Sequence, residues 1–306
     1  LPTVTGVSIP DPSPGVPVTV AYTYNGNATI PDRSKFQWYT ATAADGSGKV
    51  LIAGATDKTY TSSASDAGKY LVAEVTPASY DTVVGTPVTA VSSSSVAPVE
   101  QPFPTGTTLE ANGRDFGIDS GFPATGFSSA KFQVQISGNP SNNSGYTWSS
   151  DQSWVSVDSS GNVKFTGVPT SSTKSFKIKA KRTSDGSVSA KSFTLRDWYR
   201  LSSNAASKAD ATATCSQTGS VLATVNQLNG ASHGTSKYGN GVRGTIGSLW
   251  SEWGSLMTYP SSGAISNMMY WTSEMYNSSS TYTVFLDSGS YNITNINIAP
   301  VCRQSL

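Results

Sequence analysis

Apolar and polar side chains alternate along two stretches of the first hundred residues. In GVPVTVAYTY (15–24), every second residue from Val16 to Tyr24 is a valine or a tyrosine. A period of two is typical of a strand with one buried face. A second alternation, Phe36 and Trp38, is followed along the chain by SDAGKYLV (65–72). These patterns predict short strands joined by turns over residues 1–98.

The same period returns between residues 103 and 196. In AKFQVQIS (130–137) three apolar residues alternate with one lysine and two glutamines, and in SFKIKAKR (175–182) three apolar residues alternate with three lysines. SSGN (159–162) supplies a turn between two further strands. We therefore expect a second β-sandwich over residues 99–196. The lysine face could steer an acidic partner, or it could be a solvated face that discourages pairing between sheet edges.

The pattern changes after residue 196. The segment SSNAASKADATATCSQTG (202–219) contains five alanines and predicts a helix, with Ser203 or Asn204 as its N-cap and Gly219 at its end. TYTVFLDSGSYNITNINIAPVC (281–302) predicts two strands joined by a turn at residues 287–290. Residues 197–306 are therefore expected to form a third domain, which mixes α and β structure.

Large side chains are concentrated in GSLWSEWGSLMTYP (247–260). Trp250 and Trp253 are three residues apart, so on a helical turn they point to one side, and Trp271 follows closely enough to meet them. We expect at least two of these three rings to lie in a core. Glu252 should then point away from that core or accept hydrogen bonds from backbone donors.

The alternative is that the large side chains form a contact patch for a ligand. Methionine and tyrosine are adaptable or amphipathic and are enriched at interfaces, so they suit this role better than the tryptophans. The candidates in this loop-rich stretch are Met257, Tyr259, Met268, Met269, Met275 and Tyr276. Some of them must also contribute to the core.

Composition agrees with β structure and limits the possible partners. Only 13% of the residues are charged, and 20 basic against 19 acidic residues leave a net charge of +1, too little for binding nucleic acid or an anionic membrane surface. The apolar runs are shorter than the ~20 residues that span a bilayer, and Leu1-Pro2-Thr3 does not begin a secretion signal. We expect a fragment of a longer chain, without membrane insertion.

The sequence offers few residues that could form a catalytic or metal-binding site. His233 is the one histidine in the sequence, and it lies in a glycine- and serine-rich loop, so neither a His-based triad nor a zinc cluster is expected. Residues 197–306 contain five scattered carboxylates, whereas Ca²⁺ needs six to eight oxygen ligands in one place. We therefore predict no enzyme activity, no metal and no cofactor. The two cysteines indicate one disulfide or, alternatively, two buried thiols.

Two sets of residues resemble known families. Trp38, followed by Asp66-x-Gly68-x-Tyr70, is similar to the core tryptophan and tyrosine corner of the immunoglobulin fold, which implies that Trp38 and Tyr70 are core residues. The order of a Cys-containing helix, GSVLAT, GSLWSEWG, YWTSE and a last strand with Cys resembles the C-type-lectin-like tip of the intimin and invasin adhesins. FPATGFSSAKFQVQI and YTWSS resemble the stalk domain before such a tip.

The second resemblance implies an architecture and a role. The fold class is mainly β: two immunoglobulin-like sandwiches, 1–98 and 99–196, then an α+β C-type-lectin-like domain, 197–306. It implies a disulfide between Cys215 and Cys302. Trp250, Trp253 and Trp271 are the aromatic core residues expected from their spacing. The sugar-binding signatures of calcium-dependent lectins are absent from the sequence. The family is anchored at the bacterial surface through an outer-membrane β-barrel, which this fragment does not include.

The resemblance implies a monomeric adhesin tip that binds a host protein, either a receptor such as an integrin or a serum protein. An integrin-type target needs an exposed acidic side chain, and Asp287 is the candidate, although a turn-forming role is the alternative. Two other functions stay open: a calcium-independent carbohydrate-binding lectin, and a stalk fragment with no ligand of its own.

Overall fold

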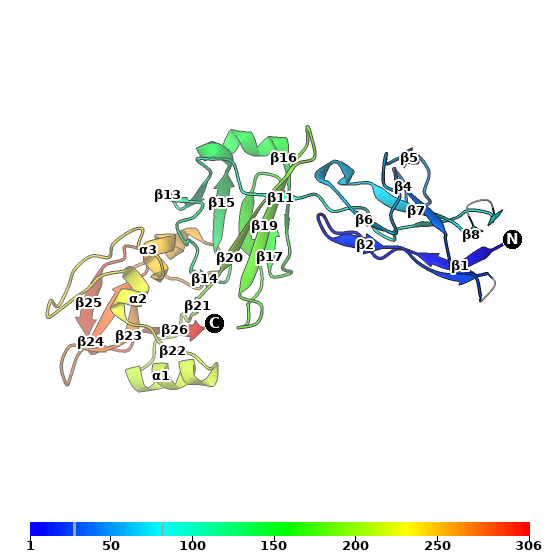
Figure 1. Ribbon diagram of the computed structural model, residues 1–306. Coiled ribbons are helices and arrows are strands. Elements are labelled where there is room, and N and C mark those ends of the chain that lie inside the picture. Colours follow the sequence, from blue (N-terminus) through cyan, green and yellow to red (C-terminus); the bar gives the residue numbers. More distant parts are fainter. Residues whose placement is uncertain (27–28, 81–82) are drawn as a thin grey trace. The chain divides into compact units, whose positions relative to one another are not determined.

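The computed structural model describes residues 1–26, 29–80 and 83–306, and the chain divides into two compact units. We call Leu1–Glu100 unit 1 and Gln101–Leu306 unit 2. Both are built mainly from antiparallel strands in an immunoglobulin-like arrangement, and the described α-helices are short and lie in unit 2 (Figure 1). The predicted division of the second unit near residue 196 stays a prediction.

Unit 1 consists of short strands and one 3-10 turn. Their bounds are β1 Thr3–Ser8, β2 Pro17–Thr19, β3 Ala21–Asn25, β4 Lys35–Ala41, β5 Val50–Leu51, β6 Thr59–Thr61, η1 Ala64–Asp66, β7 Tyr70–Thr76, β8 Ala78–Tyr80, β9 Val83–Val84 and β10 Val88–Val91. The largest described sheet has the order β10-β7-β4-β5, and the other described pairs are β1-β3, β2-β6 and β8-β9.

Trp38 lies at the centre of the unit 1 core. It is fully buried on β4, pairs with Ala73 on β7, and its indole N–H donates to the carbonyl of Asp57 at 2.9 Å. Tyr70 differs from the expectation for a core residue, because it is only half-buried at the start of β7. The hydroxyl that donates to Asp66 belongs instead to Tyr60, at 2.8 Å.

The alternation over residues 15–24 forms two strands rather than one. β2 pairs with β6 and β3 pairs with β1, so the ladder changes partner at Val20, which is itself buried. Period two correctly marks Val18 and Val20 as buried, whereas Val16, just before β2, is 52% exposed. The pattern carries no information on the partner of each strand.

The remaining elements lie in unit 2, apart from Glu100 at the start of β11, which is the last residue of unit 1. Their bounds are β11 Glu100–Gln101, β12 Thr108–Ala111, β13 Arg114–Gly117, β14 Thr125–Phe127, β15 Lys131–Gln135, η2 Ile136–Gly138, η3 Pro140–Gly145, β16 Tyr146–Ser150, β17 Val155–Val157, β18 Asn162–Phe165, β19 Ser175–Arg182, β20 Val188–Thr194, β21 Asp197–Leu201, α1 Lys208–Gln217, β22 Val221–Leu222, α2 Val225–Asn229, α3 Leu249–Trp253, η4 Leu256–Thr258, β23 Met269–Met275, β24 Thr281–Phe285, β25 Tyr291–Thr294 and β26 Ala299–Ser305.

Three sheets organise these strands. Two of them, β11-β20-β19-β16 and β13-β12-β15-β18-β17, form the sandwich, and the third has the order β14-β21-β26-β23-β24-β25, with β22 beside β26. β14 comes from the middle of the sandwich sequence but pairs in parallel with β21 in the third sheet. Gly126 is required there, because a Cβ atom would lie 2.8 Å from the ring of Trp198. The sandwich therefore contributes a strand to the sheet of the last third.

One continuous core runs through unit 2. Trp253 is fully buried, and its ring packs against phenylalanines of the sandwich, with ring centroids 5.0 Å from Phe122, 5.6 Å from Phe127 and 6.0 Å from Phe165. These rings meet at tilted or edge-to-face angles, the arrangement that aromatic side chains prefer. Because Trp253 belongs to the last third, the two parts share their most deeply buried ring cluster.

We predict that Trp253→Ala lowers the free energy of unfolding of unit 2 by about 3–5 kcal/mol, because it leaves a cavity among the phenylalanines. Half-buried Trp250 is the matched control, and Trp250→Ala should have less than half this effect. Differential scanning calorimetry of the full chain measures both variants. Trp38→Ala identifies the unit 1 transition, which neither variant should move. Equal effects of the two substitutions would contradict the prediction.

Candidate functional site

Helix α3 fixes the loops of the C-terminal segment, residues 197–306, to the sandwich. Its Glu252 side chain is fully buried, and its carboxylate accepts hydrogen bonds from the backbone N–H groups of Ala124, Thr125 and Gly247 at 2.6 to 3.2 Å and from the Thr125 hydroxyl at 2.6 Å. The Trp253 indole N–H donates to the same hydroxyl oxygen at 2.9 Å. Of the two orientations expected for Glu252, bonding to backbone donors is the one observed.

The surroundings of Glu252 alter its protonation. Burial raises the pKa of the Glu252 carboxyl to about 7, while the hydrogen bonds from Thr125, Gly247 and Ala124 act in the opposite direction. Gly247 can donate here because its φ of +91° is one that glycine adopts readily. The result is a carboxyl group that holds two segments more than a hundred residues apart in the sequence.

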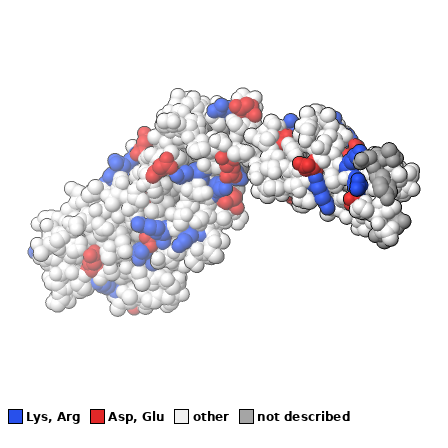
Figure 2. Space-filling view, in the orientation of Figure 1, with Lys and Arg blue, Asp and Glu red and all other residues white. Residues whose placement is uncertain are grey.

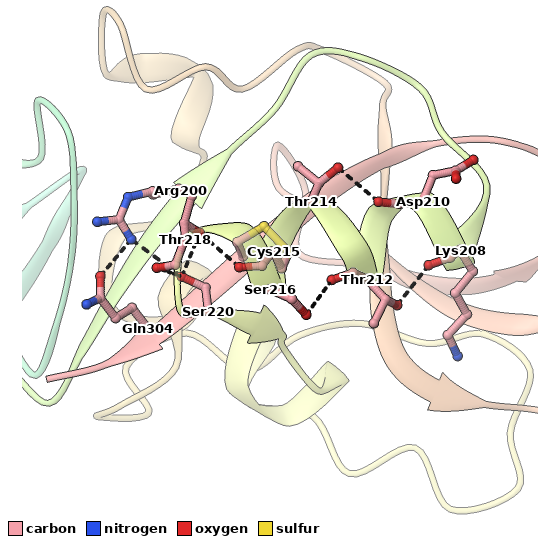
Figure 3. The surroundings of a disulfide bond; sticks show 11 residues. Arg200, Lys208, Asp210, Thr212, Thr214, Cys215, Ser216, Thr218, Ser220 and Gln304 are labelled. Carbon is pink, nitrogen blue, oxygen red and sulfur yellow. Dashed lines mark hydrogen bonds between the residues drawn. A yellow bond between two sulfur atoms is a disulfide. The ribbon is translucent and has the colours of Figure 1, made fainter.

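Helix α1 is held to the third sheet by the disulfide between Cys215 and Cys302, whose Cα atoms are 5.1 Å apart (Figure 3). Ala211 and Cys215 are its two buried residues, and three of its hydroxyls bond back to carbonyls of the preceding turn, as Thr212 does to Lys208 at 2.8 Å. A ten-residue helix with so small an apolar face is marginal by itself. The disulfide therefore adds a covalent attachment to β26.

The predicted cap of this helix was wrong. α1 begins at Lys208 with Ser207 as its N-cap, which accepts from the Asp210 N–H at 3.2 Å, rather than at Ser203 or Asn204. The preceding residues are held extended, because Ala206 bridges to Ile298 and accepts a hydrogen bond from the Trp271 indole at 2.9 Å. The predicted end is confirmed, since Gly219 adopts a φ of +66°.

Two hydrogen bonds hold together the loops at the N-terminal end of β23. The Asp287 carboxylate accepts from the Asn267 N–H at 2.8 Å, and the Leu256 N–H donates to Leu286 at 2.9 Å, so the loop after α3 lies beside the β24–β25 turn. Met257 is 39% exposed and Ile265 is 38% exposed, while Met268 and Asp287 are half-buried. We call the residues Met257, Ile265, Met268 and Asp287 the Asp287 surface. Three of these four, all except Ile265, are predicted contact residues.

Met275 and Tyr276 lie at the opposite end of β23, on the order of 20 Å away along the strand. Met275 is 50% exposed, and its sulfur accepts from the Lys208 ammonium at 2.9 Å. The Tyr276 ring packs edge-on against Tyr282 and lies 5.6 Å from the Lys237 ammonium. The structure thus divides the predicted contact residues between two places.

Two of the predicted contact residues face inward. Tyr259 is 6% exposed, and its hydroxyl donates to the Trp253 carbonyl at 3.0 Å, so it supports α3 rather than the outer surface. Met269 packs against the small core around the disulfide, which also contains Trp271. Trp253 and Trp271 are buried, whereas Trp250 is half-buried with the Arg243 guanidinium 5.8 Å from its ring.

Sequence reasoning missed Ile265 and Asn267, because the loop they occupy has no periodicity. His233 lies in another such loop, and its ring nitrogens face the Gly234 carbonyl at 2.9 Å and Glu274 at 3.2 Å. Within residues 1–26, 29–80 and 83–306, no group of three or more His, Cys, Asp or Glu side chains is placed to hold a metal ion. No helix in this described part is long and apolar enough to span a bilayer.

Charge on the visible face is mixed. Figure 2 shows Lys and Arg side chains interspersed with Asp and Glu, and most of that face is uncharged. No single-sign field of the kind that attracts nucleic acid is visible there.

Comparison with known proteins identifies the family. A model described as invasin, domain 4, matches residues 107–193, and the AIR9 A9 domain model matches residues 6–92. The inverse autotransporter adhesin YeeJ of Escherichia coli (strain K12) is 32% identical over 198 residues, which cover 61% of this chain. Invasin of Yersinia enterocolitica is 28% identical over 205 residues, or 66% of this chain. The chain belongs to the intimin/invasin family.

The solved structure of invasin, described as a bacterial integrin-binding protein, aligns with the whole chain at a TM-score of 0.57 and 21% identity, which is a likeness of fold. This member of the intimin/invasin family spans 8% of the length of YeeJ, 23% of Yersinia invasin and 59% of the invasin chain in that structure.

The buried carboxyl of this family member predicts a pH-dependent stability. Because the pKa of Glu252 is about 7 in the folded state and near 4.5 in the unfolded state, the folded state binds more protons between these values. Its contribution to stability is complete below pH 4.5 and is lost as the pH rises through 7, in total about 3 kcal/mol. Urea unfolding at pH 5 and pH 8 should show this loss, and Glu252→Gln should abolish it.

Asp115→Asn is the control for this experiment, because Asp115 is an exposed carboxylate on the same unit. This variant should retain the pH dependence of the wild type. A dependence that survives in Glu252→Gln would show that another group titrates.

We also predict that dithiothreitol destabilises unit 2. The disulfide joins residues 87 apart in the sequence, and in the chain-entropy model its reduction lowers the free energy of unfolding by about 4–5 kcal/mol. For a unit of this size, that loss lowers the melting temperature by roughly 10 °C. The double variant Cys215→Ala, Cys302→Ala should melt at the reduced value with or without reductant. An unchanged midpoint on reduction would contradict the prediction.

Proposed function

We propose that this protein is a bacterial surface adhesin whose C-terminal segment, residues 197–306, is a C-type-lectin-like head that binds a host-surface or host-secreted protein. Its relatives carry the names adhesin and invasin, which supports the adhesive role. The short helices, the mixed sheet and the single disulfide of the segment support a lectin-like head. We place the chain at the bacterial surface and expect it to act as a monomer.

The Asp287 surface is the contact region that the geometry favours. It combines two exposed apolar side chains, Met257 and Ile265, with a carboxylate, and apolar anchors beside a charge are typical of protein-binding sites. Hydrogen bonds from Asn267 to Asp287 and from Leu256 to Leu286 fix the loops relative to each other. A preorganised loop surface loses less entropy on binding than a mobile one.

The Asp287 carboxylate is the feature from which we propose the class of partner. Asn267 uses one carboxylate oxygen, Oδ2, and among the described residues no hydrogen bond to Oδ1 is found. A free carboxylate oxygen on a protein surface can complete a metal site on a partner, as an integrin-type receptor requires. Invasin, the relative of known structure, is an integrin-binding protein, and we propose a receptor of the same type here.

Binding to immobilised host-surface proteins by surface plasmon resonance, with Mg²⁺ or Mn²⁺ present, tests this proposal. Asp287→Asn keeps an acceptor for the Asn267 N–H but removes the charge, and we expect it to weaken binding at least about 10-fold. Met257→Asp should have a similar effect, because it places a charge in the apolar part of the contact.

The control is Val221→Asp, which changes an exposed valine on β22, outside the Asp287 surface. This variant should bind as the wild type does. Full binding by both Asp287→Asn and Met257→Asp would refute the proposed surface. Binding to glycans that a chelator does not affect would favour a carbohydrate lectin, and binding to no host molecule would favour a stalk fragment.

A further inference from the structure

A cavity of about 380 Å³ opens between the five-stranded sheet of the sandwich and the loop after η4. β12, β15 and β18 provide its base, and Thr258, Tyr259 and Pro260 form its wall. It lies within unit 2, where the hydrogen bonds of Glu252 and Trp253 on α3 to Thr125 fix the two sides relative to each other. Its volume is at the lower end of the range for sites that bind small molecules.

Two lysines at this cavity are placed unfavourably for stability. Lys131 on β15 and Lys164 on β18 are direct partners in the antiparallel register, and both side chains line the cavity. Like charges directly opposite each other destabilise a sheet. Among the described residues, neither ammonium group has an ion pair within 4 Å, although Lys131 acts at longer range on Asp158. An anionic group between the two lysines would remove this repulsion.

The other polar groups of the lining both donate and accept hydrogen bonds. Asn112, Gln133 and Asn162 contribute amides, and Ser129 and Thr258 contribute hydroxyls. All three amides are held by the protein: Asn162 donates to Asp158 at 2.8 Å, Gln133 to the Ser160 carbonyl at 3.0 Å and Asn112 to the Ser255 carbonyl at 3.3 Å. Amides and hydroxyls match the hydroxyl groups of a sugar, which also donate and accept.

Glu110 adds the one carboxylate of the lining, and its Oε1 accepts from the Gly113 N–H at 2.6 Å. With two lysines and one glutamate, the formal charge of the lining is +1. Pro260, which is exposed, supplies an apolar part of the wall, suited to the C–H face of a sugar ring. The volume of about 380 Å³ fits a compact ligand such as a single sugar residue.

We propose that this cavity binds an acidic sugar residue, with its carboxylate or sulfate between Lys131 and Lys164 and its hydroxyls on the surrounding amides. This site uses residues other than Met257 and Asp287, so it does not depend on the proposed protein contact. It would give the adhesin a second, independent mode of attachment, to acidic glycans.

Ligand-observed NMR and calorimetric titration of the full chain test the proposal. The probes are N-acetylneuraminic acid, glucuronic acid and glucose 6-sulfate, with glucose as the neutral counterpart. At low salt we expect at least one acidic sugar to bind with a Kd of about 1 mM or below, weaker binding in 0.5 M NaCl, and no measurable binding of glucose. Carboxylate and sulfate probes distinguish the two kinds of acidic group.

Lys164→Gln should raise the Kd about 10-fold, because it removes a charge-assisted hydrogen bond. Lys181→Gln, an exposed lysine on the other sheet of the sandwich, is the matched control and should leave the Kd unchanged. Without any ligand, the double variant Lys131→Gln, Lys164→Gln should melt about 1 °C or more above the wild type at low salt, because the like-charge pair is gone.

Three results would overturn the proposal. The first is no binding of any acidic sugar at 10 mM, and the second is equal binding of glucose and the acidic sugars. The third is binding that the double lysine variant leaves unchanged. Binding of a glutamate-rich peptide in place of the sugars would assign the cavity to an acidic protein segment instead. None of these results bears on the Asp287 surface, whose test uses a host protein and other variants.

Discussion

The architecture of unit 2 depends on the packing of α3 against β14, through the buried side chains of Glu252 and Trp253. A five-residue helix cannot be stable by itself, so its position is set by what its side chains reach. Glu252 collects three backbone N–H groups and one hydroxyl, and Trp253 inserts its ring among the sandwich phenylalanines. A buried carboxyl is tolerable because each hydrogen bond compensates part of its lost hydration.

This packing has consequences for the loops on both sides of α3. The segment before it carries Gly247, whose N–H is one of the donors, and the segment after it leads to Tyr259, whose hydroxyl bonds the Trp253 carbonyl. Tyr259 therefore forms a wall of the cavity over the sandwich, while Met257, two residues earlier, remains exposed. One buried anchor thus orients both the proposed protein contact and the proposed sugar site.

The disulfide secures the other side of the C-terminal segment. α1 has almost no apolar face, and a short polar helix of this kind would detach readily from a sheet. Its bond to β26 joins it to the strand that pairs with β21, which in turn pairs with β14. Covalent attachment and the aromatic core therefore converge on the same sheet, and the residues of the Asp287 surface lie on its loops.

The sequence by itself determined much of this protein. Period two identified several strands and their buried faces, as at residues 131–135 and 175–182, and the order of motifs pointed to the intimin/invasin family and to the pairing of Cys215 with Cys302. It also limited Glu252 to two orientations. These properties are local, or they depend on motif order, so they can be read from one chain.

The tertiary structure decided what depends on contacts between distant segments. No sequence signal links Glu252 to Thr125, and nothing in the pattern places β14 in the sheet of the last third, since a strand's partner is not encoded in its own alternation. Tyr259 resembled a surface residue in sequence but is buried, and Ile265 lies in a loop without periodicity but is exposed. At these positions long-range packing overrides the local pattern, because the burial of a side chain depends on which distant segments of the chain pack against it.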